Sequence, residues 1–230
     1  MKILKSLGVL ALAACLVVPT GCDWTNTGKG TAIGGGAGAA LGAALGAAFG
    51  GGKGAAIGAA IGTAAGAGAG ALIGKKMDKQ KAELAQIEGA QVESVTDDNG
   101  LPAVKVTFSN GILFKTGKAD LSAGAKQSLS EFAASLRNTP DTNVQIYGYT
   151  DNTGSYAANE KVANNRSNNV KNYLVNSGVD SSRLAATGVP MDGYVADNST
   201  EAGRAQNRRV EIYISANEDM VKQANAGTLK

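Results

Sequence analysis

Residues 91–215 predict an α/β (α+β) fold, in which a mixed sheet is covered by helices on one side. The first observation is a pair of β-rich runs, 91–96 and 103–108, joined by an Asp-Asp-Asn-Gly turn sequence. The second is the helical spacing of apolar and small residues over 121–136 and again over 156–176. The third is that strand-like runs alternate with these helical segments along the chain, which is typical of a layered sheet-and-helix domain.

The remaining elements follow from local signals. Ser122 is a suitable N-cap for the first helix, and Gly178 is a suitable C′ residue for the second. Residues 216–230 form a polar tail that we expect to be frayed. The other predicted elements are a strand over 144–149, an extended piece over 183–189, a brief helix opening at 199–201 and running to about 208, and a closing strand over 209–215.

Composition excludes several classes of function. The 230 residues include no histidine, which removes the commonest general base and metal ligand. The only two cysteines lie in the first 22 residues, so neither a disulfide framework nor a Cys/His metal site is expected. Charge is nearly balanced, at 22 Lys+Arg against 19 Asp+Glu, which does not predict nucleic-acid binding. We therefore expect no enzyme, no cofactor and no metal.

The N-terminus predicts export. Two lysines precede an apolar run from Leu7 to Val18, as in a secretory signal peptide. The segment resembles a bacterial lipoprotein signal covering 1–21, in which Cys22 becomes the lipidated (palmitate-bearing) first residue; Cys15 is the alternative. Residues 22–27 are then a lipid-anchored tether. The resemblance implies anchoring in the cell outer membrane with the domain in the periplasm, although the residue after Cys22, Asp23, favours the inner membrane in enterobacterial sorting.

Residues 28–74 contain a glycine ladder. Of the 47 residues from Gly28 to Gly74, 18 are glycine and 17 are alanine, with glycines four apart in two sets. Residues four apart stack on one helical face, so we expect a hairpin of two helices, each roughly 17 to 20 residues long and near the length that spans a bilayer. Such faces allow close helix contact in lipid and leave a homo-oligomer as an option. The alternative is a flexible Gly/Ala linker.

Residues 75–90 change to charged helix formers. This stretch predicts a short linker helix whose basic residues lie close to anionic headgroups.

The helix over 156–176 interrupts its own apolar stripe. The stripe runs through Asn159, Ala163, Arg166, Val170 and Tyr173, so a guanidinium occupies a core-facing position and needs an anion. Asp151, just after the preceding strand, is the nearest candidate in the chain. An Asp and an Arg side by side can bind a zwitterion, the Asp taking an ammonium and the Arg a carboxylate. The alternative is a closed Asp151–Arg166 ion pair that only fixes the loop.

Two motifs carry a family resemblance. Tyr149-Thr150-Asp151-Asn152-Thr153-Gly154, followed by Asn159 and Arg166, precedes a second motif, Gly203-Arg204-Ala205-Gln206-Asn207-Arg208-Arg209-Val210-Glu211-Ile212. Over about residues 105–215, this order is similar to the OmpA-like C-terminal domain, a peptidoglycan-binding family. The lipoprotein signal and glycine zipper that precede it make the whole layout resemble lipoproteins of the YiaD type. The sequence departs from the OmpA-like pattern at Tyr194, where proline is frequent, and at Gly188-Val189-Pro190.

The resemblance implies roles for individual residues. Asp151, Arg166 and Asn159 fall where the family binds diaminopimelate of the peptidoglycan stem peptide. Secondary ligand contacts or loop-fixing roles are implied for Thr150, Thr153, Asn207 and Arg208.

The sequence thus predicts a lipid-anchored envelope protein that binds peptidoglycan and tethers a membrane to the cell wall. Its expected partners are peptidoglycan and the lipid membrane. The alternative is a self-assembling or pore-forming membrane protein, driven by the glycine ladder, that uses the domain as an anchor.

Overall fold

The computed structural model describes residues 67–97, 100–114 and 118–230. The predicted signal peptide, both cysteines and the glycine ladder up to residue 66 lie outside these residues. The sheet is formed by β1 (Ala90–Thr96), β2 (Pro102–Ser109), β3 (Thr142–Tyr149), β4 (Leu184–Val189) and β5 (Arg209–Ala216), in the order β1-β2-β5-β3-β4. Only β3 and β4 pair in parallel, and the other neighbours are antiparallel.

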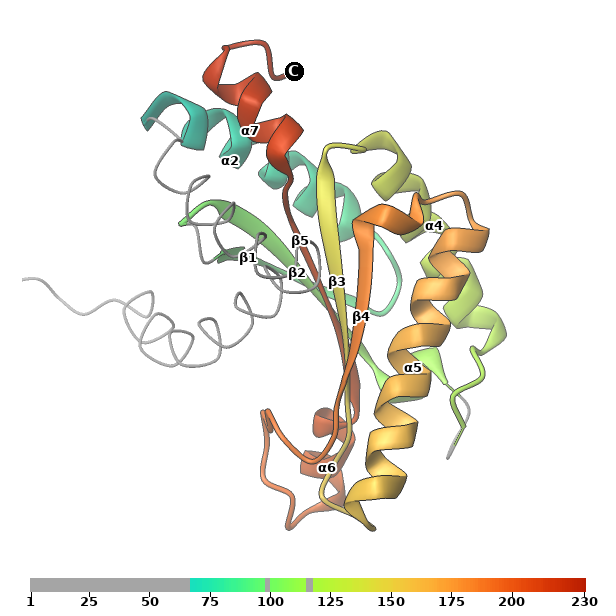
Figure 1. Cartoon of the computed structure of the whole chain (residues 1–230). Helices are drawn as coiled ribbons and strands as arrows, with labels where there is room; N and C mark the ends of the chain where they lie inside the picture. The colour runs from blue at the N-terminus through green and yellow to red at the C-terminus, as the bar shows by residue number, and fades with distance from the viewer. Residues whose placement is uncertain (1–66, 98–99, 115–117) are drawn as a thin grey trace, which may run out of the picture. The chain divides into compact units, whose positions relative to one another are not determined.

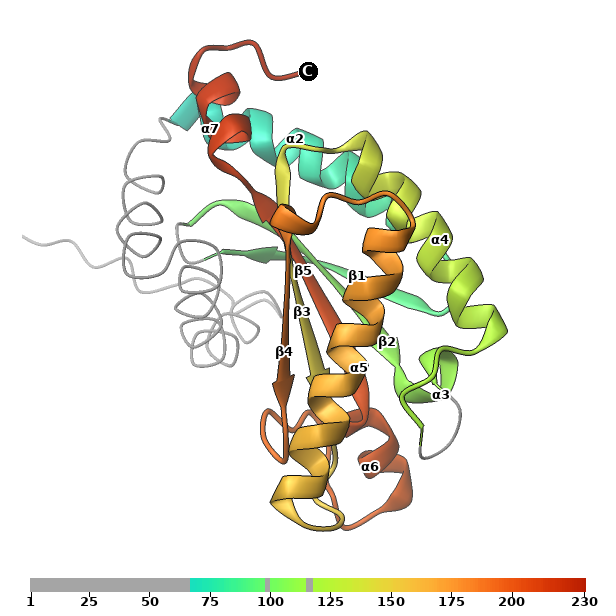
Figure 2. The same cartoon turned by 45° about the vertical axis from the view of Figure 1, so that its right-hand side comes forward.

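Three helices cover one face of this sheet, namely α2 (Ala67–Leu84), α4 (Ala123–Asn138) and α5 (Tyr156–Asn176) (Figures 1 and 2). The core lies between these layers, because alternate strand residues such as Val106, Ile146 and Ile212 are fully buried against helix residues such as Phe132 and Val170. The predicted mixed sheet with helices on one side is therefore confirmed. The short elements are α3 (Asn110–Leu113), η1 (Ser181–Arg183) and α6 (Glu201–Asn207).

Local sequence signals act as predicted. The Ser122 hydroxyl accepts a hydrogen bond from the Ala125 amide at 3.0 Å and caps α4. Gly178 follows α5 with φ +87°, the left-handed conformation that ends helices. A Cβ added to Gly148 of β3 would lie 2.6 Å from the carbonyl oxygen of Ala163 in α5. The missing side chain lets α5 lie directly on the sheet.

Helix α2 extends across the predicted boundary at residue 74 as one continuous helix. Its buried stripe, at intervals of three or four residues, comprises Ala69, Ile73, Met77, Gln80 and Leu84. Lys76 pairs with Asp141 at 2.6 Å, and the Gln80 amide donates to Thr139 Oγ1 at 2.8 Å. Residues 67–84 are thus packed into the domain, where the sequence suggested a membrane-hairpin end followed by a linker. None of the described helices combines the length and apolarity needed to cross a bilayer.

The C-terminal residues are more ordered than expected. Ala216 still belongs to β5, and residues Glu218–Asn225 form a further helix, α7, capped by the Asn217 side chain. Met220, Val221 and Ala224 are buried, and α7 packs against α2 (Figure 1). The expectation of a frayed tail is corrected here. Three apolar residues at helical spacing were hidden among polar neighbours.

Candidate functional site

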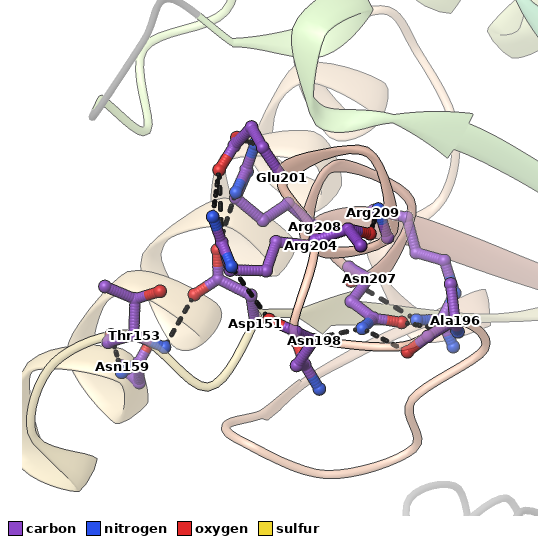
Figure 3. A network of polar contacts seen from close by, with 12 residues as sticks. Asp151, Thr153, Asn159, Ala196, Asn198, Glu201, Arg204, Asn207, Arg208 and Arg209 are labelled. Atoms are coloured by element: carbon purple, nitrogen blue, oxygen red, sulfur yellow. Dashed lines mark hydrogen bonds and ion pairs between the residues drawn. The ribbon is translucent and has the colours of Figure 1, made fainter.

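Asp151 lies just beyond the end of β3, close to the N-terminus of α5. The residue is 7% exposed, and its carboxylate accepts hydrogen bonds from the Thr153 amide at 2.9 Å and from Arg208 Nη1 at 2.6 Å (Figure 3). Burial acts to raise the pKa of Asp151, but these hydrogen bonds outweigh burial and hold the pKa below its usual value. The group is therefore an anion at neutral pH.

Arg208 bridges two carboxylates. Its second terminal nitrogen binds Glu201 Oε1 at 2.6 Å, and Glu201 also pairs with Arg204 at 2.9 Å (Figure 3). The ion-pair partner of Asp151 is thus Arg208, 57 residues further along the chain, and the closed Asp151–Arg166 ion pair does not form.

Arg166 is buried and has no anionic partner among the residues that the structure describes. The residue is 5% exposed, and its Nε and Nη2 each donate to the Lys118 carbonyl oxygen at a long distance of 3.4 Å. Its guanidinium carbon lies 5.4 Å from the centre of the Phe114 ring. Among the described residues, no carboxylate lies within ion-pair distance of this group. Burial, followed by repulsion from Arg208, lowers the pKa of Arg166 to about 10, with Asp151 opposing the fall.

Three of the other predicted residues shape the loop after β3. Asn159 donates from Nδ2 to the carbonyl oxygens of Thr153, at 2.8 Å, and Ser155, at 3.1 Å. The Thr150 hydroxyl accepts from the Met191 amide at 3.0 Å. The structure therefore gives Asn159, Thr150 and Thr153 loop-fixing contacts beside Asp151.

Asn207 fixes the loop that follows β4. It is fully buried, and its Oδ1 accepts from the amides of Val195 and Ala196 at 2.8 and 3.0 Å. Its Nδ2 donates to the Ala196 carbonyl oxygen and to Asn198 Oδ1 (Figure 3). All four contacts are internal, so Asn207 holds the loop in place.

A second buried arginine, Arg209, was not predicted from the sequence. Arg209 pairs with Glu211 at 2.7 Å, stacks on the Tyr149 ring at 3.8 Å and donates to the Gly193 carbonyl oxygen at 2.9 Å. Burial, followed by the charge of Glu211, raises the pKa values of Tyr149 and Tyr213. Residues 209 and 211 share one face of β5, so strand alternation alone could have placed them together.

The charges of the site do not balance locally. Asp151, Arg208 and Glu201 neutralise one another in part, whereas the Arg166 guanidinium keeps donors that only weak contacts occupy. A ligand carboxylate beside Asp151 would supply the missing anion. The arrangement suits the binding of a group that carries both charges.

Comparison with known proteins identifies the family. Residues 113–208 match the OmpA family, and residues 1–78 match the YMGG-like Gly-zipper. The "Probable lipoprotein YiaD" of Escherichia coli (strain K12) is 37% identical over 210 residues, which cover 90% of this chain and 93% of that protein. The chain belongs to the OmpA family.

Two further similar proteins match only part of this chain. The "Peptidoglycan-binding protein ArfA" of Mycobacterium tuberculosis (strain H37Rv) is 37% identical over 113 residues, which cover 49% of this chain and 35% of that protein. The structure of the cell wall anchor of the T6SS from Pseudomonas aeruginosa superimposes with a TM-score of 0.52 at 26% identity. The superposition covers 61% of this chain and 96% of the T6SS protein chain.

Proposed function

We propose that this protein binds peptidoglycan non-covalently by gripping diaminopimelate of the stem peptide between Asp151 and Arg166. The single observation that carries the proposal is the buried Arg166 guanidinium, which has no carboxylate partner in the described part of the chain. A buried charge without a partner is strongly unfavourable, so a carboxylate ligand would gain both attraction and hydrogen bonds.

Asp151 can take the ammonium of the same ligand. A carboxylate has about four acceptor sites, and the structure uses two of them, for Thr153 and Arg208. Arg208 therefore orients the carboxylate, with Glu201 holding Arg208 in turn. Asn159 steadies the loop on which Asp151 lies.

The comparisons support a cell-wall role within the envelope. ArfA is named for peptidoglycan binding, the T6SS protein is described as a cell wall anchor, and YiaD is named a lipoprotein. By these likenesses, residues 1–21 are a signal peptide, and Cys22, with Cys15 as the alternative, carries lipid including palmitate. The protein then tethers the outer membrane to the wall from the periplasmic side.

A pull-down of the full chain on purified sacculi tests the proposal. Sacculi with diaminopimelate should retain the protein, and sacculi with lysine at that position should retain little, because lysine has the ammonium but lacks the second carboxylate. Asp151→Ala and Arg166→Met should each abolish retention, whereas Lys222→Ala, at an exposed ion pair of α7, should not. Retention of both site variants at the parent level would refute the zwitterion site.

The anchor needs a separate experiment. Cells labelled with palmitate should show labelled parent protein and Cys15→Ala protein, and no label on Cys22→Ala. The opposite pattern would move the anchor to Cys15.

A further inference from the structure

Helix α5 carries an unusual number of asparagines. Seven of its 21 residues are Asn, a residue that lowers helix stability relative to Ala. Four of the seven have structural contacts; these are Asn159, Asn164, Asn168 and Asn169. The side chains of the other three, Asn165, Asn172 and Asn176, are exposed and make no hydrogen bond to any described residue.

Some of these asparagines border a shallow, open groove on the surface. Asn169, Asn172, Tyr173 and Asn176 of α5 face residues around the start of α4, including Asp120 and Lys126, across a space of about 310 Å³. That volume lies at the lower end of the range for small-molecule pockets.

Several polar groups of the groove are free. The Tyr173 hydroxyl donates to the Lys126 carbonyl oxygen at 2.7 Å, which joins the two walls. The side chains of Asp120, Lys126, Asn172 and Asn176 have no hydrogen bond or ion pair within the described structure. They offer amide donors, amide acceptors, one carboxylate and one ammonium.

The groove lies next to the segment that contacts Arg166. The Lys118 carbonyl oxygen accepts from Arg166, and the next carbonyl oxygen, that of Ala119, accepts from Asn169 at 2.8 Å. The short segment of Lys118 and Ala119 thus lies between the groove and the Arg166 guanidinium. Along α5, Asn172 lies six residues beyond Arg166, roughly 9 Å at the rise of an α-helix.

We propose that this groove binds the N-acetylated sugar from which the stem peptide branches. The inference rests on the proposed function, because the peptide must be held at Arg166. About two residues separate the diamino acid from the sugar-linked end of the stem, and with the linkage they span on the order of 10 Å. Amide side chains match sugar hydroxyl and acetamido groups because each amide both donates and accepts hydrogen bonds.

Calorimetric titration of the full chain in detergent micelles tests the groove with three probes. These are a disaccharide-peptide fragment of peptidoglycan, the same peptide without sugar, and the disaccharide alone. The parent should bind the disaccharide-peptide on the order of tenfold more tightly than the peptide, as expected for a few neutral hydrogen bonds. The double variant Asn172→Ala/Asn176→Ala should lose this advantage and bind the free peptide as the parent does.

The design separates binding from folding. Alanine is a better helix former than asparagine, so the double variant should unfold at the same temperature as the parent or higher. Asn165→Ala makes the same type of change on the same helix, at an exposed residue outside the groove lining, and it should keep the sugar advantage.

Equal affinity of the parent for the disaccharide-peptide and the free peptide would overturn the groove proposal. An equal loss of affinity for the disaccharide-peptide and for the free peptide in the double variant would also overturn it. Failure of the free peptide to bind, with retained binding of the disaccharide that the double variant abolishes, would instead contradict the proposed function and support the groove.

Discussion

Replacing Arg166 by methionine keeps a long unbranched side chain and removes the guanidinium. The fall of the Arg166 pKa from 12.5 to about 10 corresponds to about 3 kcal/mol of unfavourable free energy for the charged form in the folded protein. The group is still charged at neutral pH, so this penalty is present there. Against it stand two long hydrogen bonds and the Phe114 contact, together worth about 1 to 2 kcal/mol.

Arg166→Met should therefore leave the free energy of unfolding unchanged or raise it by about 1 to 2 kcal/mol. The same change should weaken peptidoglycan binding on the order of 10²-fold, because two charge-assisted hydrogen bonds to the ligand carboxylate are lost. Stability and binding would thus move in opposite directions, as expected for a charge kept for function.

Arg209 provides the matched control. It is equally buried, but it pairs with Glu211 at 2.7 Å and donates to two backbone carbonyl oxygens. Arg209→Met leaves the Glu211 carboxylate buried without its partner and should lower the free energy of unfolding by about 3 to 5 kcal/mol.

Urea unfolding of the parent and the two variants measures these changes in the free energy of unfolding. A loss of more than about 2 kcal/mol in Arg166→Met would show that the guanidinium is structural, and the reasoning from its missing partner would fail. Unchanged sacculus binding by Arg166→Met would refute the proposed role of the guanidinium in ligand binding.

Three further outcomes are expected. Sacculus binding should stay constant between about pH 5 and pH 8, because the chain has no histidine and the pKa of Asp151 is held below its usual range. Binding should fall only as the pH drops through that lowered pKa, and a midpoint above about pH 5 would contradict this. Gly148→Ala should destabilise the fold by about 2 to 3 kcal/mol in urea, since its Cβ would meet a backbone oxygen of α5 at 2.6 Å, whereas Gly124→Ala in open space should not. Met220→Ala should lower the free energy of unfolding by about 3 kcal/mol if α7 belongs to the core, and a value near zero would show a loosely held tail.

The sequence predicted those parts of the fold in which local signals agree. Helix α5 has a buried stripe and a glycine at its C-terminal end, and both signals indicate the same helix. The same stripe identified Arg166 as a residue out of place in a core, because one polar residue in an apolar seam is visible without a structure.

Other features depend on tertiary contacts that no local pattern contains. The buried stripe of α2 runs from a Gly/Ala-rich segment into a charged one. The change in composition therefore predicted a boundary inside what is a single packed helix. Helix α7 has eight residues, too few for a periodicity signal to be clear. The pairing of Asp151 with Arg208 joins residues 57 positions apart, and only the sheet brings them together.

The most direct test of the central claim is a comparison of two stem peptides that differ only in diaminopimelate or lysine. The parent should bind the diaminopimelate peptide on the order of 10²-fold more tightly, because only that peptide offers Arg166 a second carboxylate. Arg166→Met should bind both peptides equally weakly. Preference for diaminopimelate that persists in Arg166→Met would contradict the account.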